Sequence, residues 1–217
     1  MTNYTQWKSL VDLHEYSAIP DSEVLRPRED DLDHFAGDTG GYDINDDQPL
    51  FDAELSLKVT DTSEPEIRST TGLNRYPDAG ETTEVHVYPS SDETNDDGTF
   101  GVWWSASDDA VNSADGYGFR SQRGDLRVTK RDNGSFTELG SQDNVFTAGE
   151  WHRVNITHAS NGDITVTVYD TTDTQQGQVS VNDSQFITDG SFDNQGILIN
   201  EFLGVDGHAF ADWDVVE

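Results

Sequence analysis

Short alternating strands separated by turns run through the chain from residue 51 to residue 216. Every second residue of Phe51–Val59 is apolar, and in Asp163–Tyr169 the apolar Ile164, Val166 and Val168 alternate with threonines and an aspartate. A period of two places one face of each strand in a core and the other in water. No segment has the period of 3.6 residues that indicates a helix. The pattern predicts an all-β, antiparallel fold.

Two hairpins stand out because an Asn-Gly pair lies between alternating segments. Asn133–Gly134 interrupts Leu126–Leu139, and Asn161–Gly162 separates Trp151–His158 from Asp163–Tyr169. An Asn-Gly pair supplies the positive φ angles of a tight primed turn. The other predicted strands are Glu84–Tyr88, Phe100–Ser105, Gln178–Val181, Gly196–Phe202 and Ala209–Val216. About ten or more such strands predict a β-sandwich.

Acidic residues outnumber basic ones by 43 to 12, which gives a formal net charge of −31. The charges are spread through every segment, so an acidic surface for one basic partner is the less favoured explanation. The screening length falls to about 3 Å in 1 M salt, so this surface tolerates molar salt and repels itself in dilute buffer. The same charge disfavours nucleic acid as a partner, because phosphate contacts need a basic face.

Composition excludes several other classes of protein. The chain has no cysteine, hence no disulfide and no thiolate metal site. No apolar run approaches the roughly 20 residues that span a bilayer, so we expect no membrane insertion. The amino terminus lacks a signal-peptide pattern, which predicts release by lysis or assembly. Ten Phe, seven Tyr and five Trp are too many for a disordered chain.

Residues 1–48 differ from the remainder. Pro20, Pro27 and the glycines of Gly37–Gly41 disfavour a long helix there. We predict an extended N-terminal arm over residues 1–48 that docks on a neighbouring chain, followed by a sandwich domain over residues 49–217. Two alternatives remain for this segment: a first strand with loops of the same domain, or a flexible tail.

Phe146–Thr157 carries the sequence G-x-W-H-x-V from Gly149 to Val154. This segment, with the Asn-Gly turn and valine strand that follow, resembles the corresponding strand of laminin-G-like and other concanavalin A-like jelly rolls. Asp212–Val216 resembles the last strand of that fold, which commonly returns beside the first. The resemblance covers roughly residues 40–217 and implies an antiparallel two-sheet jelly-roll sandwich. That fold hosts lectins, glucanases and structural modules, so it leaves function open.

A second resemblance concerns habitat and role. The acidic composition resembles proteins of extremely halophilic archaea and their viruses, and Leu10–Ser22 resembles haloarchaeal virus and provirus structural proteins. It implies a structural component of a virus particle, as a capsid turret, decoration, tail-fibre or spike protein, assembled in a high-salt cytoplasm and located in the virion. The arm would then bind copies of this chain and other virion proteins. Viral or host origin, position in the particle and oligomer symmetry stay open.

A glycosidase of the laminarinase type is the least favoured function. That chemistry needs two carboxylates across the scissile bond, and the family carries them in a Glu-x-Asp-x-x-Glu run. The nearest pairs here, Asp52 with Glu54 and Asp212 with Asp214, each lack the third acid. We therefore predict a protein that is not an enzyme and has no catalytic residues.

For metal ions, Glu93–Gly98 has the alternating oxygen ligands and the glycine of a calcium loop. The position of the closing bidentate glutamate is occupied by Trp104. Asp108, Asp109 and Asp115 form a second acidic segment. We predict no metal site and no cofactor, with a calcium ion in one of these acidic loops as the alternative.

A ligand platform is predicted around two adjacent tryptophans. Trp103 and Trp104 point to opposite faces of their strand, so one is expected in the core and the other on the sheet surface. Tyr117, Arg120 and Tyr88 would join the exposed tryptophan and form a platform on which a sugar ring stacks. Trp103, Trp104, Tyr117 and Arg120 are the predicted ligand-binding residues, and a host surface glycan is the predicted ligand. Alternatively, the arm or a neighbouring subunit covers the exposed ring.

Overall fold

A computed structural model describes part of the chain, and the account below concerns that part. The described residues are 24–25, 35–37, 39–45, 56–59, 67–69, 80, 82–89, 99–104, 115–186, 198–200, 207–210 and 213–216. These residues form strands and turns, with one 3-10 turn, η1, at Thr39–Gly41. The predicted acidic segment Glu93–Gly98, and Asp108 with Asp109, lie outside the described residues.

The first of two large sheets has six antiparallel strands in the order β1-β16-β6-β11-β12-β13. Its strands are β1 (Val24–Leu25), β16 (Trp213–Val216), β6 (Thr82–Val87), β11 (His152–His158), β12 (Asp163–Tyr169) and β13 (Gln175–Asn182). Strand β16 pairs with β1 and β6, so the closing strand returns beside the first one, as the jelly-roll resemblance implies.

The second large sheet has seven strands in the order β10-β9-β8-β7-β14-β5-β2, and a small sheet has the order β15-β4-β3. The seven are β10 (Ser135–Gln142), β9 (Asp125–Asp132), β8 (Gly116–Gln122), β7 (Thr99–Trp104), β14 (Leu198–Asn200), β5 (Ile67–Ser69) and β2 (Phe35–Gly37). The small sheet contains β15 (Gly207–Phe210), β4 (Ser56–Val59) and β3 (Tyr42–Asn45).

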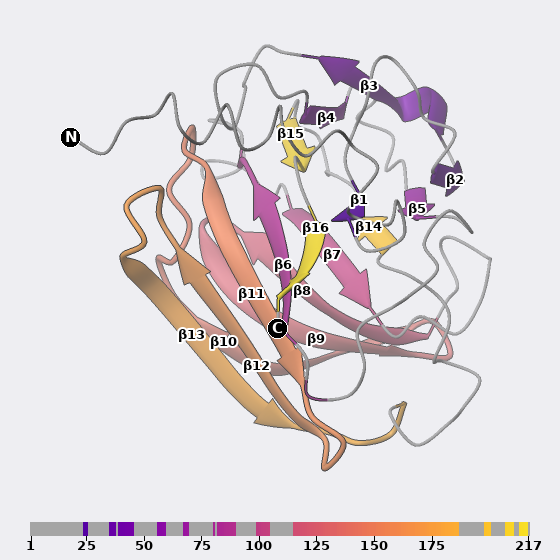
Figure 1. The fold of residues 1–217 in the computed structure, drawn as a ribbon. Helices are drawn as coiled ribbons and strands as arrows, with labels where there is room; N and C mark the ends of the chain where they lie inside the picture. The colour runs from indigo at the N-terminus through magenta and orange to yellow at the C-terminus, as the bar shows by residue number, and fades with distance from the viewer. Residues whose placement is uncertain are drawn as a thin grey trace.

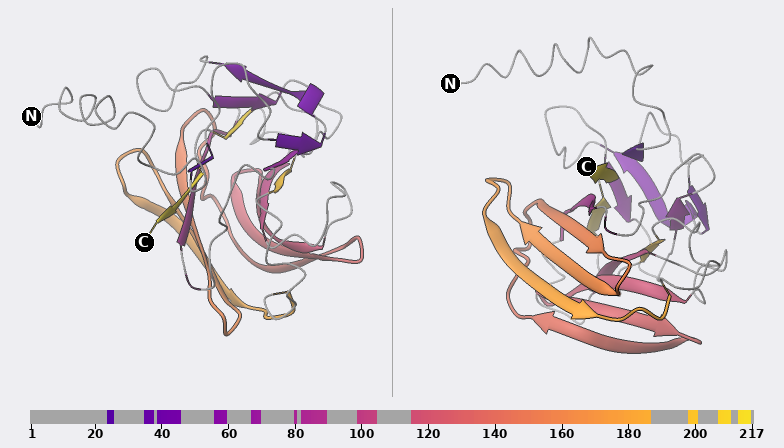
Figure 2. Two further views of the ribbon diagram at one scale, coloured as in Figure 1. Left: turned by 45° about the vertical axis from the view of Figure 1, so that its right-hand side comes forward. Right: turned by 60° about the horizontal axis from the view of Figure 1, so that its bottom comes forward.

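The two large sheets lie face to face, and the small sheet lies towards one end of them (Figure 1). The long hairpins of both sheets are visibly curved, and β10 meets β13 where the sheets approach at one edge (Figure 2). The predicted all-β, two-sheet jelly-roll sandwich is confirmed. Strands β1, β2 and β3 come from residues 24–45, so these parts of the predicted arm pair within the three sheets. Docking of the arm on another chain stays a prediction.

The core forms between the two large sheets because alternate residues of each strand point inward. From the six-stranded sheet it contains Val85, Val87, Val154, Ile156, Ile164, Val166 and Val168, and from the seven-stranded sheet Val102, Phe119, Leu126 and Val128, all buried. The loop residue Phe146 stacks on Phe119 at 6.3 Å between ring centroids. Trp151 is also buried. Burial of each valine, isoleucine or leucine side chain of this core contributes about 1.5–3 kcal/mol to the free energy of unfolding.

Tight turns fix the register of β8, β9 and β10. Asn133 and Gly134 have φ angles of 49° and 75°, which confirms the predicted primed turn. Arg123 and Gly124 have φ angles of 56° and 82° and make an equivalent turn between β8 and β9. In the other predicted hairpin only Gly162 has a positive φ, of 87°, and its N–H donates to the Ala159 carbonyl at 2.9 Å. The turn therefore runs from Ala159 to Gly162 and starts earlier than predicted, because Gly162 is its last residue and not one of its two central residues.

A segment after β13 closes one end of the sandwich. The Tyr117 hydroxyl donates to Asp183 Oδ1 at 2.6 Å and accepts from the Phe186 N–H at 3.2 Å. Lys130 Nζ donates to Asp183 Oδ2 at 2.5 Å. Burial and the Asp183 hydrogen bond raise the pKa of Tyr117. Burial alone would raise the pKa of Asp183, but Lys130 and Tyr117 hold it below its ordinary value. This polar clamp thus joins β8, β9 and the end of β13.

Two histidines of β11 pack towards the core, His152 buried and His158 half-buried. His152 Nε2 lies 3.0 Å from the Thr147 nitrogen and 3.1 Å from the Thr147 carbonyl oxygen, and the ring tautomer sets which of them it bonds. His158 Nδ1 accepts from Trp104 Nε1 at 3.3 Å. Burial lowers the pKa of both imidazoles, and nearby groups, including the Thr147 and Asp183 backbones, offset this in part. At His158, protonation of Nδ1 would also remove the lone pair that accepts from Trp104. The folded state therefore excludes protons that the unfolded chain takes up.

These histidines predict a loss of stability on acidification. Unfolded histidine titrates near pH 6.5, above the folded values, so stability is complete above that pH and falls as pH falls below it. We expect the thermal midpoint in multi-molar KCl to drop between about pH 7.5 and 5.5, where carboxylates stay ionised. The slope is at most about 1.4 kcal/mol per pH unit for each histidine. His158→Gln should reduce the slope, and a midpoint that rises on acidification would contradict this account.

Candidate functional site

On the outer face of the seven-stranded sheet, Gly118 of β8 has no side chain and leaves room for a neighbouring ring. Trp103 of β7 pairs with Gly118 of β8, and a Cβ at Gly118 would lie only 2.6 Å from Trp103 Cδ2. A Cβ at Gly101 would lie 3.7 Å from Trp103 Nε1. The indole of Trp103 therefore lies directly over the β8 backbone, in space that any other residue would fill. An aromatic ring that covers a strand glycine restores the packing that the glycine lacks.

The predicted ligand residues divide between the two faces of this sheet. Trp104 and Tyr117 pair across β7 and β8 and face the six-stranded sheet, where the Tyr117 ring meets the ring of His158 at 4.9 Å. Trp103 and Arg120 occupy the opposite face. Both tryptophans are buried, with exposed fractions of 4% and 7%. Tyr88 directly follows β6 of the other sheet, and its ring packs against Trp151 with 5.4 Å between ring centroids. The four predicted residues thus form two pairs rather than one platform.

Phe136 of β10 covers Trp103. The two ring centroids are 5.6 Å apart. The Phe136 side chain is 50% exposed, and among the described residues it is the one large apolar side chain that is exposed. Arg120 and Arg131 lie over the same phenyl ring, with Cζ atoms 5.5 Å and 5.2 Å from its centroid. We call Trp103, Arg120, Arg127, Arg131 and Phe136 the arginine–aromatic patch. It occupies the sheet face that points away from the core.

Charge compensation within the patch is uneven. Arg127 donates to Glu138 at 3.0 Å and lies 3.6 Å from Asp125. Arg131 has an exposed fraction of only 9%, yet within the described part of the chain no carboxylate pairs with it and its Nε makes no hydrogen bond. Burying a cation without an opposite charge is costly, and the Phe136 ring is the contact that the structure gives this guanidinium.

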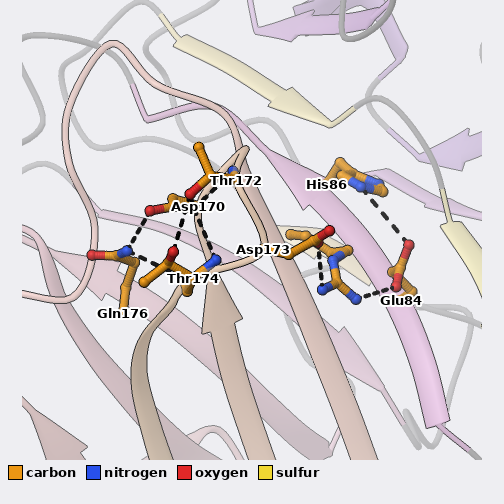
Figure 3. Close-up of polar contacts among 8 residues, drawn as sticks. Glu84, His86, Asp170, Thr172, Asp173, Thr174 and Gln176 are labelled. Carbon is orange, nitrogen blue, oxygen red and sulfur yellow. Dashed lines mark hydrogen bonds and ion pairs between the residues drawn. The ribbon is translucent and has the colours of Figure 1, made fainter. Parts of the chain in front are cut away.

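Arg153, on the outer face of the six-stranded sheet, differs from Arg131 because it pairs with two carboxylates. Glu84 and Asp173 converge on the guanidinium of Arg153, at 3.0 Å and 2.9 Å (Figure 3). The same guanidinium lies 4.4 Å from the centroid of Tyr169. Burial alone would lower the pKa of Arg153, but these two carboxylates hold it above its ordinary value. The charge of Arg153 is therefore satisfied within the chain.

The acidic loop beside Arg153 is also internally satisfied. Asp170 accepts from the N–H groups of Thr172 and Thr174 at 2.8 Å and 3.0 Å, and from the Gln176 amide at 2.7 Å (Figure 3). The Thr172 hydroxyl and the Thr174 backbone lower the pKa of Asp170. The loop is thus a structural turn between β12 and β13.

Three residues of the patch were missed in the sequence: Arg127, Arg131 and Phe136. The signal was present, because Arg127 and Arg131 are four residues apart on a strand and therefore share a face. The two-residue turn at Asn133–Gly134 also places Phe136 directly opposite Arg131. The alternation of β9 and the turn type together predict this pairing.

No group of three or more His, Cys, Asp or Glu side chains in the described part of the chain is arranged to hold a metal ion. Asp115, from one of the two predicted acidic segments, instead accepts from the Asn133 N–H at 2.6 Å and supports the β9–β10 turn. Within the same residues, no helix is long and apolar enough to cross a membrane.

Comparison with known proteins shows the fold and not a family. No family model and no curated protein matches the sequence. A solved carbohydrate binding module, CBM66 from Bacillus subtilis, is similar with a TM-score of 0.55 and 12% identity, over 84% of this chain and 93% of that one. A protein of unknown function from Shewanella oneidensis has a TM-score of 0.59 and 11% identity, over 99% and 94%. A galectin from Caenorhabditis elegans has a TM-score of 0.45 and 12% identity, over 86% and 99%.

Substitution of Gly118 tests whether the Trp103 indole packs directly on the β8 backbone. In Gly118→Ala the new methyl group must lift the indole, so we expect a loss of about 1–3 kcal/mol in unfolding free energy and a red shift of tryptophan emission. Gly134→Ala is the control, because a Cβ there meets nothing within 4 Å and only the positive φ is strained, at a cost of about 1–2 kcal/mol. Equal emission spectra for the two variants would contradict this packing.

Proposed function

We propose that this chain is a non-enzymatic carbohydrate-binding module that binds a glycan on the arginine–aromatic patch. The observation that carries the proposal is the half-exposed Phe136 ring, supported from beneath by Trp103 and flanked by Arg120 and Arg131. An exposed aromatic ring that packs on a second ring and is flanked by guanidinium groups offers both stacking and hydrogen bonding to a ligand.

The patch matches the two chemical characters of a sugar. The C–H groups of a pyranose face are apolar and fit against the negative face of an aromatic ring. Hydroxyl oxygens around the ring accept hydrogen bonds, and guanidinium groups supply several donors in a fixed plane. Packing against Trp103 holds Phe136 in place before a ligand arrives, which reduces the entropy lost on binding.

The structural comparisons support this function through the fold alone. The similarity to a carbohydrate binding module makes a sugar ligand more plausible for a jelly roll of this shape. The non-enzymatic part of the proposal is supported by the sequence, which lacks the Glu-x-Asp-x-x-Glu run of laminarinase-type glycosidases. Turnover of a β-glucan, abolished by a single carboxylate substitution, would contradict the non-enzymatic part of the proposal.

A second candidate function is a building block of a haloarchaeal virus particle, such as a turret, decoration, tail-fibre or spike protein located in the virion. The observation that favours it is the net charge of −31 spread over the whole chain, together with the resemblance of residues 10–22. The two functions are compatible, because a virion protein can recognise host glycans. A closed oligomer of the full chain in multi-molar KCl would support the particle role, and a monomer would favour a free-standing module.

Binding to a broad glycan array in multi-molar KCl tests the proposed function. Phe136→Ala removes the exposed ring from a surface position, so we expect at least a tenfold loss of affinity, about 1.4 kcal/mol, with the fold retained. Thr165→Ala is the matched control, because Thr165 lies in the other sheet and its hydroxyl contacts Ser180 at 3.2 Å. Binding that Phe136→Ala leaves unchanged would contradict the assigned patch.

A further inference from the structure

Basic residues are concentrated in one hairpin of this acidic chain. Of the 12 Lys and Arg residues, Arg120, Arg123, Arg127, Lys130 and Arg131 all lie within residues 120–131, a segment with a single acid, Asp125. The chain as a whole has a net charge of −31, so this hairpin has the opposite sign to its surroundings. A local positive field within a negative protein favours an anionic ligand at that place and repels anions elsewhere.

Three of these cations project from the same face as Phe136. Arg120 and Arg127 are direct cross-strand neighbours in the β8–β9 register, and Arg131 lies on the same face of β9. Like charges directly opposite each other on a sheet reduce stability. Lys130 points to the other face, where Asp183 neutralises it. The arrangement places the guanidinium groups of Arg120 and Arg131 over one exposed ring, with Arg127 on the same face.

The alternative is that these arginines only neutralise the chain's own carboxylates. Arg153 does this with Glu84 and Asp173, and Arg127 does so with Glu138. Arg131 differs, because it is more buried than Arg127 and pairs with no carboxylate among the described residues. A guanidinium this buried, with no carboxylate partner among the described residues, is the observation that points to a ligand.

We infer that the ligand of the patch is an anionic glycan, one whose sugar units carry carboxylate or sulfate groups. The inference rests on the proposed function and specifies its ligand class. A sugar ring against Phe136 would lie between the guanidinium groups of Arg120 and Arg131. The planar fork of arginine binds carboxylate and sulfate oxygens with two parallel hydrogen bonds. Because the screening length in molar salt is about 3 Å, only such contact pairs persist there, and a nine-tenths buried guanidinium is screened least.

Two matched probe pairs test the ligand class on the full chain. Galacturonate oligosaccharides are compared with their methyl esters, and dextran sulfate oligosaccharides with uncharged dextran, by titration in multi-molar KCl. We expect the charged member of at least one pair to bind tenfold or more tightly than its uncharged partner. The pair that responds distinguishes a carboxylate from a sulfate ligand.

Variants assign the charge preference to the patch. Arg131→Gln should remove at least tenfold in affinity for the charged probe. Arg153→Gln, which changes the net charge by the same amount on the other sheet, should not. Ser141→Glu is a second variant that leaves the core intact and adds a carboxylate opposite Arg127 on the patch face, and it should also weaken binding. Equal effects of Arg131→Gln and Arg153→Gln would overturn the assignment.

The outcomes separate the inference from the proposed function. Binding to uncharged glycans alone, with loss in Phe136→Ala, would overturn the anionic ligand class and leave the glycan site standing. Binding of charged probes that Phe136→Ala does not weaken would overturn sugar recognition on the patch. No binding to any probe or array glycan would overturn both.

Discussion

The register of the β8–β9–β10 meander is the constraint on which both faces of the seven-stranded sheet depend. Two-residue turns at Arg123–Gly124 and Asn133–Gly134 set this register through paired positive φ angles. Phe119 then faces the core and Arg120 faces outward. A slip of one residue would expose every core side chain of these strands and bury their arginines. The same strand register therefore places the apolar side chains of β8 and β9 in the core and the arginine–aromatic patch on the outer face.

The patch shows how a strongly acidic chain can present a cationic surface. Its 43 carboxylates are spread along the sequence, and Arg153 pairs with one on the neighbouring strand β6 and with one in the β12–β13 turn. Arg131 instead lies between Gly116 and Phe136 on the neighbouring strands, with its guanidinium over the Phe136 ring. Among the described residues its guanidinium contacts an aromatic ring and forms no ion pair. In molar salt such short-range arrangements matter more than the total charge, because distant charges are screened.

Much of the fold was predictable from the period of two. Asp163–Tyr169 forms the predicted strand with its valines inward, and the Asn133–Gly134 turn has the predicted geometry. The alternation also placed Trp103 and Trp104 on opposite faces, but a strand pattern says nothing about what covers each face. Tyr117 and Arg120 are three residues apart, so the same alternation already excluded a shared platform. The earlier turn before Gly162 depends on local hydrogen bonds that the Asn-Gly pair alone does not specify.

The all-β class, the short hairpins and the excess of negative charge follow from the sequence alone, because strand periodicity, turn residues and composition are local properties. Tertiary structure was needed to bring Trp103, Arg131 and Phe136 from three different strands onto one face. It also decided that Arg153 has carboxylate partners within the chain while Arg131 has none among the described residues. Charge pairing depends on distance in space, and residues far apart in sequence acquire that distance only when the sheets form.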